Sequence, residues 1–402
     1  MIIRKKRRKR KTRVSPKIFV IIGVLLLVIG AVLFILLHNG RAELAEAGTM
    51  MFRLNGKNAV IIRDEYTFLS TELAKVDFHK EEGARVSSGD LLATAYKLGY
   101  SDELMQSLLN SREQVYAAQM ERIGSTKDQK LDEFNENIAL IKERVEDRVM
   151  NSSGEDLESL YRQLDQLLRD RMEYLRQKVQ ETENLRALYA EADRQEQLVS
   201  AWTEEVYSDR SGRVSYYFDG YEQAMNVEKL NMLSADLISR AVKESGAARW
   251  TTDDKTRVCR VVNENKWYIA FLTKGESLTR LASGVEYEVN ITGYGTYKGI
   301  AKEPFISGDQ VVNLIEFDSP LGNLIEVRTI KVDISAAVSG VKVKASAISF
   351  EKNEPYLELV LTESHHSIRI DVLAVEDKTA VIRAHNSTDN ITEGVSYWNR
   401  RR

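Results

Sequence analysis

Cysteine is almost absent from this chain, which has Cys259 as its single example in 402 residues. One cysteine excludes any disulfide bond within the chain. The sequence around it, RVCRVV, has the character of a strand, so we expect Cys259 to be a buried and inert thiol. Histidine is scarce as well. The five histidines are scattered and form no Ser/His/Asp grouping: His38, His79, His365, His366 and His385.

Other signs of catalysis or cofactor binding are missing. His365 and His366 are adjacent on a predicted strand and so point to opposite faces, which does not suit a shared metal ion. The segment GYGTYKG (293–299) lacks the Gly-x-Gly-x-x-Gly spacing of a nucleotide-binding turn and lies between predicted strands. We therefore predict no catalytic, cofactor-binding or metal-binding residues and no enzymatic activity.

Acidic residues are absent from the first 17 positions, which hold ten of the 57 Lys and Arg residues. In the rest of the chain 47 basic residues face 60 acidic ones, a formal net charge of −13. An acidic body does not suit general nucleic-acid binding, so we expect no nucleic-acid partner. The basic segment needs a separate explanation.

That explanation is the apolar run IFVIIGVLLLVIGAVLFILL (18–37), which follows the basic segment directly. At about 1.5 Å per residue, a helix of this length spans the roughly 30 Å of a bilayer's hydrocarbon. The positive-inside rule then places residues 1–17 in the cytoplasm and the chain after His38 outside. A cleaved signal peptide is disfavoured because its apolar region is shorter, about 7–15 residues. We predict a single transmembrane helix at 18–38 of the cytoplasmic membrane.

Proline is absent from 101–208, a region rich in Glu, Gln, Arg, Leu and Ala. Apolar residues recur there at steps of three and four, from Leu131 to Val149 and again from Leu157 to Tyr189, which is typical of a narrow coiled-coil seam. With a turn at NSSGED (151–156), this pattern predicts an antiparallel helical hairpin about 70 Å long. The stretch IGSTKDQ (123–129) weakens the first arm and indicates a kink or a gap between two shorter helices. A polar helix pair packed on a domain is the alternative.

Two similar β segments flank this helical region. The first, KVDFHKEEGARVSSGDLLATAY (75–96), reads as a strand, a glycine turn and a strand, and DRSGRVSYYFDGYEQAM (209–225) repeats this order. Each resembles one half of a biotinyl/lipoyl carrier domain, so we predict a split sandwich with the hairpin inserted between its halves. Lys97 lies near the position of a carrier's modified lysine but lacks the Met-Lys-Met or Asp-Lys-Ala surroundings, and we expect it to be a solvated residue.

The remaining sequence is mostly β. Short apolar-alternating runs separated by glycine turns between 256 and 338 predict a small antiparallel barrel. A further run of short strands begins at GVKVKASAI (340–348) and predicts a separate β module near the membrane.

This order of modules resembles that of the HlyD-like membrane fusion proteins, also called periplasmic adaptor subunits. The resemblance covers nearly the whole chain from residue 18 and is carried by the anchor, the split halves, the inserted hairpin and the β tail. Lys344 stands where the family commonly has proline. The resemblance implies a non-catalytic transport adaptor without a cofactor. It also implies a homo-oligomer that stands on an inner-membrane transporter, either an ABC or a proton-driven pump.

In two-membrane envelopes, the family docks its hairpin tip on an outer-membrane channel through an Arg-x-x-Leu pattern followed by Ser. The segment RVEDRVMNSSGEDLESL (144–160) lacks this pattern, which argues against such a channel. A partner in a one-membrane envelope is then attractive. The predicted partner contact is the turn at the tip: Asn151, Ser152, Ser153, Gly154 and Glu155. A scaffold for wall or division proteins, without transport, is the alternative function.

We thus expect an α+β chain, a membrane protein with its bulk outside the cytoplasm. Its expected parts are a basic cytoplasmic tail (1–17), a transmembrane helix (18–38), a membrane-proximal start with the first lipoyl-like half (39–100), a coiled-coil hairpin (101–208), the second lipoyl-like half (209–226), a connecting helical segment (227–255), a β-barrel-like domain (256–338) and a membrane-proximal β domain (339–402).

Overall fold

The structure is a computed structural model that describes residues 24–29, 40–124, 127–151, 157–244, 251–252, 255–361 and 364–399. The predicted cytoplasmic tail at 1–17 lies outside these ranges. Of the predicted transmembrane segment at 18–38 only residues 24–29 are described, and they are helical. Within the described ranges, no helix is long and apolar enough to cross a membrane.

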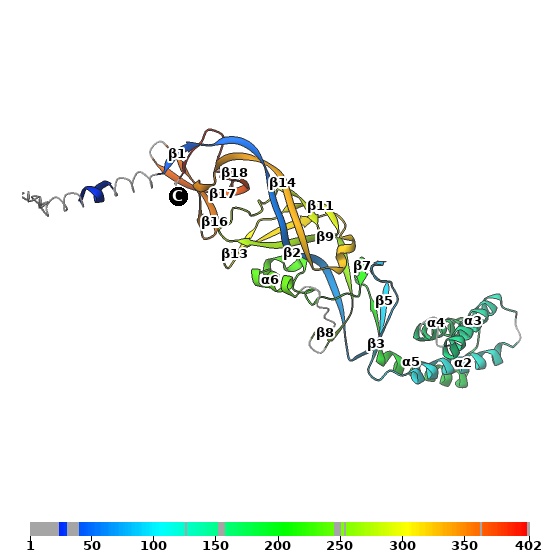
Figure 1. Cartoon of the computed structure of the whole chain (residues 1–402). Helices are drawn as coiled ribbons and strands as arrows, with labels where there is room; N and C mark the ends of the chain where they lie inside the picture. The colour runs from blue at the N-terminus through cyan, green and yellow to red at the C-terminus, as the bar shows by residue number, and fades with distance from the viewer. Residues whose placement is uncertain are drawn as a thin grey trace, which may run out of the picture. The chain divides into compact units, whose positions relative to one another are not determined.

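The helical segments are concentrated in one stretch of the chain (Figure 1). Its four long helices are α2 (Asp102–Ile123), α3 (Gln129–Asn151), α4 (Leu157–Arg176) and α5 (Glu183–Trp202). The other helical elements are short: η1 (Val227–Met232), α6 (Ala235–Lys243), η2 (Gly322–Glu326) and η3 (Ala345–Ala347).

Strands occupy most of the remaining chain. They are β1 (Arg41–Leu44), β2 (Glu46–Thr71), β3 (Leu73–Phe78), β4 (Arg85–Val86), β5 (Leu91–Lys97), β6 (Thr203–Tyr207), β7 (Gly212–Ser215), β8 (Thr251–Thr252), β9 (Lys255–Lys274), β10 (Glu286–Ile291), β11 (Gly295–Ala301), β12 (Phe305–Ser307), β13 (Gln310–Phe317), β14 (Thr329–Lys344), β15 (Ile348–Glu351), β16 (Glu354–Val360), β17 (His365–Glu376), β18 (Thr379–Ala384) and β19 (Ser396–Asn399). The predicted combination of β modules with a helical insertion is confirmed.

The chain divides into two compact units. The first unit comprises residues 1–59, 270–316 and 331–402, and the second comprises 60–269 and 317–330. Strands β2, β9 and β14 contribute residues to both units. Their pairing closes a ring in the order β2, β14, β10, β11, β13, β9 and back to β2, which is a six-stranded barrel. The long strand β2 is therefore part of the barrel. The prediction for 39–100 had placed this stretch in the membrane-proximal start and the first lipoyl-like half.

The first unit also contains an antiparallel sheet with the order β1, β19, β16, β17, β18. Its apolar core is built from alternate strand positions such as Val341, Leu357, Ile370 and Ile382. The β15–β16 hairpin turns through Lys352 and Asn353, which both have positive φ, as a two-residue turn between twisted strands requires.

In the second unit the two predicted sandwich segments come together. Strands β3, β5 and β6 form one sheet, and β4 pairs with β7. Backbone hydrogen bonds join the halves directly, from Gly83 N to Val214 O at 2.9 Å and from Val214 N to Ala84 O at 3.0 Å. The shared core includes Leu92, Val214 and Cys259. The thiol is buried and free, and burial raises its pKa to about 12, in agreement with the predicted inert cysteine.

A buried network of charged side chains ties the strands of the second unit together. Arg328 donates to Glu65 (Nη2–Oε1, 2.5 Å) and to Asp219 (Nε–Oδ2, 2.8 Å). Arg260 reaches the second oxygen of Glu65, also at 2.5 Å. Arg63 donates to the Ile325 carbonyl at 2.7 Å, at the end of η2. Each of these groups sits in a protein interior, where an unpaired charge would be strongly destabilising.

The pKa values in this network follow from its charges. Burial alone would raise the pKa of Glu65 and Asp219, but the neighbouring arginines, Arg328 and Arg63 foremost, hold both pKa values below their usual range. Burial lowers the pKa of Arg63 to about 9, and the positive charge of Arg328 acts in the same direction. The carboxylates are therefore ionised in the folded chain.

Candidate functional site in the helical bundle

The four long helices form a bundle and not the predicted two-armed hairpin. Arg112 of α2 binds Asp165 of α4 at 2.5 Å, and Gln119 of α2 donates to the Met172 carbonyl of α4 at 2.9 Å. Both pairs are 53 residues apart in the chain, so α2 and α4 run parallel to each other. In a straight hairpin that turned at 151–156, Arg112 and Asp165 would lie roughly 40 Å apart.

All four helices share one apolar core. The first cluster joins Leu108 of α2, Ile138 of α3, Leu164 of α4 and Val199 of α5. A second cluster, which includes Val115, Met172 and Tyr189, continues it along α2, α4 and α5. The predicted seams of α3 and α4 are thus buried, but against α2 and α5 as well as against each other. The predicted length of about 70 Å is wrong, because each helix of 20 to 23 residues is only about 30–35 Å long.

The reason for the folded arrangement lies in two helix ends. Gly124 ends α2 with a φ of +70°, and its N–H donates to the Met120 carbonyl at 3.0 Å. Thr182 begins α5, where its hydroxyl accepts from Leu185 N at 3.2 Å. Each predicted arm is therefore broken near its middle. For the first arm, the predicted gap at 123–129 between two shorter helices is confirmed, and the continuous arm is wrong.

One arginine connects the bundle to the sandwich. Arg162 of α4 forms an ion pair with Asp77 of β3 and donates to Thr94 of β5 at 3.0 Å. The same guanidinium contacts the ring of His79, whose Nε2 lies 2.9 Å from the Thr94 hydroxyl. A cavity of about 370 Å³ opens beside it between the sheet and helices α2, α4 and α5. We call Arg162, Asp77, His79 and Thr94 the base contact.

The base contact keeps its histidine neutral. Burial lowers the pKa of His79 to about 4, and the positive charge of Arg162 acts in the same direction. A neutral imidazole can accept the hydrogen bond that Arg162 donates, whereas an imidazolium beside the guanidinium would repel it. The base contact is therefore stable only when the His79 ring is neutral.

A second polar contact closes the opposite end of the bundle. Asp128, just before α3, accepts from Tyr174 in the last turn of α4 at 2.8 Å and from Lys178, just after α4, at 2.5 Å. These hydrogen bonds, that of Lys178 first, lower the pKa of Asp128 to about 2. The end of the bundle remote from the sheet is thus made by the α2–α3 and α4–α5 connections.

Of the five predicted tip residues, the structure describes only the first. Asn151 is the last residue of α3, while Ser152, Ser153, Gly154 and Glu155 lie outside the described residues. The base contact is made by Arg162 near the beginning of α4, so this part of α4 lies at the end of the bundle that faces the sheet. The role of these residues as a partner contact stays a prediction.

Other residues singled out in the sequence have ordinary surroundings. Lys97 at the end of β5 lies 3.9 Å from Glu204 and is partly buried. His365 binds Glu358 at 2.7 Å across neighbouring strands. Among the residues that the structure describes, no group of three or more His, Cys, Asp or Glu side chains could hold a metal ion.

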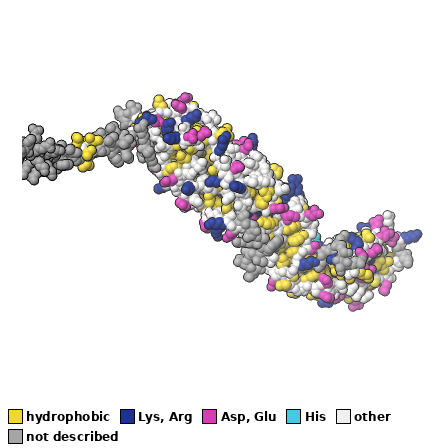
Figure 2. All heavy atoms as spheres, in the orientation of Figure 1, with side chains coloured by type: hydrophobic (Ala, Val, Ile, Leu, Met, Phe, Trp, Pro, Cys, Tyr) yellow, Lys and Arg dark blue, Asp and Glu magenta, His cyan; other side chains and the backbone are white. Residues whose placement is uncertain are grey.

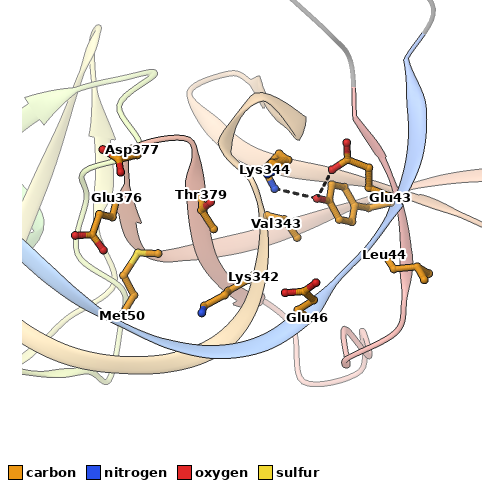
Figure 3. Close-up of a pocket in the computed structure, with 11 residues that line it drawn as sticks. Glu43, Leu44, Glu46, Met50, Lys342, Val343, Lys344, Glu376, Asp377 and Thr379 are labelled. Carbon is orange, nitrogen blue, oxygen red and sulfur yellow. Dashed lines mark hydrogen bonds between the residues drawn. The ribbon is translucent and has the colours of Figure 1, made fainter.

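The first unit has a cavity of about 390 Å³ that carries charges of both signs (Figure 3). Tyr397 accepts from Lys344 N at 3.0 Å, and its hydroxyl lies 3.2 Å from Glu43 Oε2. Burial would raise the pKa of Glu43, but hydrogen bonds from Asn399 and Arg41 outweigh it and lower that pKa. The charged lining suits a polar protein contact better than an apolar small molecule.

The base contact could not be predicted from the sequence. Asp77 and Arg162 are 85 residues apart, and no local pattern relates them. The available signals were weak: a histidine and an aspartate on a predicted strand, and an arginine next to the apolar seam. Charged and polar side chains cover the visible surface of the bundle without one dominant sign (Figure 2), so charge patterning did not mark a site either.

A family model described as "RND related, barrel-sandwich hybrid domain" matches residues 65–249. This range contains β3 to β7 and the whole helical bundle, the same split sandwich with its insertion. The match identifies this part of the chain as similar to an RND-related barrel-sandwich hybrid domain. The match supports the resemblance to the membrane fusion proteins, which are non-enzymatic adaptors in efflux and transport.

Several solved structures match this chain at low sequence identity. ZneB from Cupriavidus metallidurans is 14% identical, with 90% of this chain and 92% of that chain covered and a TM-score of 0.34. MacA from Actinobacillus actinomycetemcomitans is 14% identical, with 88% and 98% covered and a TM-score of 0.32. The membrane fusion protein Spr0693 from Streptococcus pneumoniae R6 is 13% identical, with 70% and 97% covered and a TM-score of 0.27. No curated protein sequence matches the chain.

Proposed function

We propose that this chain is a membrane fusion protein that is anchored in the cytoplasmic membrane by residues 18–38 and stands outside the cytoplasm. There it assembles as a homo-oligomer on an inner-membrane transporter, an ABC or a proton-driven pump, and guides substrate away from the membrane. The observation that carries the proposal is the helical bundle inserted into a barrel-sandwich hybrid domain that matches the RND-related family.

The folded bundle also bears on the envelope. A bundle of about 30–35 Å reaches about half as far as the predicted hairpin of about 70 Å. Together with the missing Arg-x-x-Leu pattern, this short reach supports action in an envelope where no outer-membrane channel has to be contacted. We therefore propose a partner at the cytoplasmic membrane or in the adjacent wall.

The proposal is tested by cross-linking in intact cells, using the full chain with a tag after Arg402, followed by detergent extraction and mass spectrometry. We expect a transporter permease or its ATPase to be recovered, together with cross-linked oligomers of the tagged chain. A repeatable set of wall or division proteins without a permease would overturn the transport proposal and establish an envelope scaffold.

The topology is tested separately. Alkaline phosphatase, which is active only outside the cytoplasm, is fused after Arg402 in one chain and after Lys17 in another. We expect activity from the first fusion and none from the second, because the basic segment is retained inside. The reverse result would overturn the proposed orientation. Equal activity from both would exclude the anchor.

A further inference from the structure

The cavity of about 370 Å³ beside the base contact lies between the β3–β5–β6 sheet and the helices α2, α4 and α5. Its sheet side is made by two cross-strand pairs, Thr94 opposite Glu205 and Tyr96 opposite Thr203. Residues directly opposite each other in an antiparallel pair point to the same face, so these four side chains form one wall. The volume falls within the range of about 300–1,000 Å³ that is typical of pockets for small organic molecules. We call this space the junction cavity.

The junction cavity is apolar on its inner side and polar at its mouth. Leu108 and Met105 of α2 and Val199 of α5 line it and are only 2%, 4% and 7% exposed. Ser200 and Glu205, which also line it, are exposed and therefore mark the mouth. A ligand that fills this space places an apolar body against the helices and its polar group at the mouth, beside Glu205.

On the helix side the charges of the junction cavity cancel. Arg169 forms ion pairs with Asp165 at 2.9 Å and with Glu196 at 3.3 Å. The buried Arg112 binds the same two carboxylates, at 2.5 and 3.3 Å. Two guanidinium groups thus face two carboxylates, and neither cation is available to an anionic ligand.

On the sheet side one carboxylate remains without a cation. Arg162 is paired with Asp77 in the base contact, and the histidine of that contact is neutral. Glu205 accepts a hydrogen bond from Tyr207 but forms no ion pair with any residue that the structure describes. The junction cavity therefore carries one net negative charge, and this charge lies at its mouth.

We propose that the junction cavity binds a small organic cation with an apolar body, such as an aryl-substituted quaternary ammonium ion. The apolar body fills the space between Tyr96 and α2, where it is removed from water. The cationic group lies at Glu205, next to solvent, where its desolvation costs least. This site deepens the proposed function, because it names the class of substrate that the adaptor holds, and in that respect it rests on the transport proposal.

The test is equilibrium dialysis of the full chain, purified in a neutral detergent, against three labelled probes. Phenyltrimethylammonium has both the ring and the positive charge, tetramethylammonium has the charge alone, and benzenesulfonate has the ring with the opposite charge. Empty micelles give the background. We expect saturable binding of phenyltrimethylammonium, with one site per chain. The other two probes should bind at least about tenfold more weakly, because each lacks one of the two contributions.

Two adjacent glutamates provide a matched pair of variants. Glu204 and Glu205 follow each other on β6 and point to opposite faces of the sheet. Glu204 lies 3.1 Å from the Ser70 hydroxyl and 3.9 Å from Lys97, on the face away from the helices. E205Q should weaken the binding of phenyltrimethylammonium by about fivefold, whereas E204Q should change it by less than about twofold. Ser200→Trp, which fills the mouth from an exposed position of α5, should abolish binding.

Three results would overturn the proposal: no saturable binding of phenyltrimethylammonium, equally tight binding of benzenesulfonate, or equal effects of E205Q and E204Q. These measurements need no transporter, so the two possible failures are separate. If the chain binds the cation but no permease is recovered from cells, the site holds and the transport proposal is wrong. If a permease is recovered but the cation does not bind, the transport proposal holds and the site is wrong.

Discussion

Arg162 of α4 and Asp77 of β3 form an ion pair that joins the helical bundle to the sandwich in which it is inserted. The pair is largely buried, with side-chain exposures of 21% and 11%. The chain connects the bundle to the sheet only through the β5–α2 and α5–β6 junctions. The ion pair is thus a third point of attachment, and it fixes the orientation of α4 relative to the sheet.

Replacing this arginine is the first prediction. Arg162→Ala removes the guanidinium that pairs with Asp77, and we expect the free energy of unfolding to fall by about 1–3 kcal/mol, since the pair is partly buried. Urea unfolding followed by circular dichroism measures the change. The matched control is Arg186→Ala on α5, whose pair with Glu181 is exposed and should matter by less than about 0.5 kcal/mol. Equal effects of the two substitutions would contradict the role of the base contact.

The base contact also predicts a pH dependence. His79 has a pKa of about 4 in the folded chain against an ordinary 6.5, so between these values the unfolded state binds more protons. Stability is therefore complete above pH 6.5 and is lost as the pH falls toward 4, by about 1 kcal/mol once solvent screening is allowed for. His79→Gln should remove this loss between pH 6.5 and 5, as measured by thermal unfolding across that range. An unchanged profile in the variant would assign the loss to other groups.

The split sandwich, the barrel and the helical nature of 101–202 could be predicted because each depends on short-range pattern. Alternating strands, glycine turns and an apolar seam are all visible within about ten residues. The folding of the helices could not be predicted in this way. An apolar stripe on α3 fits α2 as well as α4, so the seam shows that a face is buried but not against which helix. Gly124 and Thr182 are the local signals of the breaks, but Thr182 also fits the spacing of the apolar seam.

The base contact and the charged network could not be predicted from the sequence, for a related reason. Glu65 and Arg328 are 263 residues apart, and only the closed barrel brings them together. Charged residues on predicted strands are usually solvated. No feature of the sequence therefore indicated that these charged residues would be buried in the second unit.

The charged network gives the third prediction. Glu65→Gln removes the carboxylate that Arg328, Arg260 and Arg63 share, and three guanidinium groups then lose a buried partner. We expect a loss of at least about 3 kcal/mol in the free energy of unfolding, because an uncompensated buried charge is costly. Glu286→Gln is the control, since its pair with Lys298 is exposed on both sides. A loss below about 1 kcal/mol for Glu65→Gln would show that the network is not required for folding.

The fourth prediction distinguishes the bundle from an extended hairpin. Glu113 of α2 and Lys142 of α3 form an ion pair at 2.8 Å, and both are partly exposed. In an extended hairpin the two residues would lie on one continuous arm, 29 positions and roughly 44 Å apart. We expect the double variant Glu113→Cys/Lys142→Cys to be cross-linked efficiently by a short bismaleimide in intact cells, while the buried Cys259 does not react.

The control pair for this experiment is Asp128→Cys/Lys178→Cys. Asp128 and Lys178 lie 2.5 Å apart in the bundle and are equally far along the chain from residue 153, so they are neighbours in a hairpin as well. Cross-linking of both pairs supports the bundle. Cross-linking of the control pair alone would mean that the helices extend in the cell, and the apolar faces of α2 and α5 that now cover α3 and α4 would then be free to pack between neighbouring subunits.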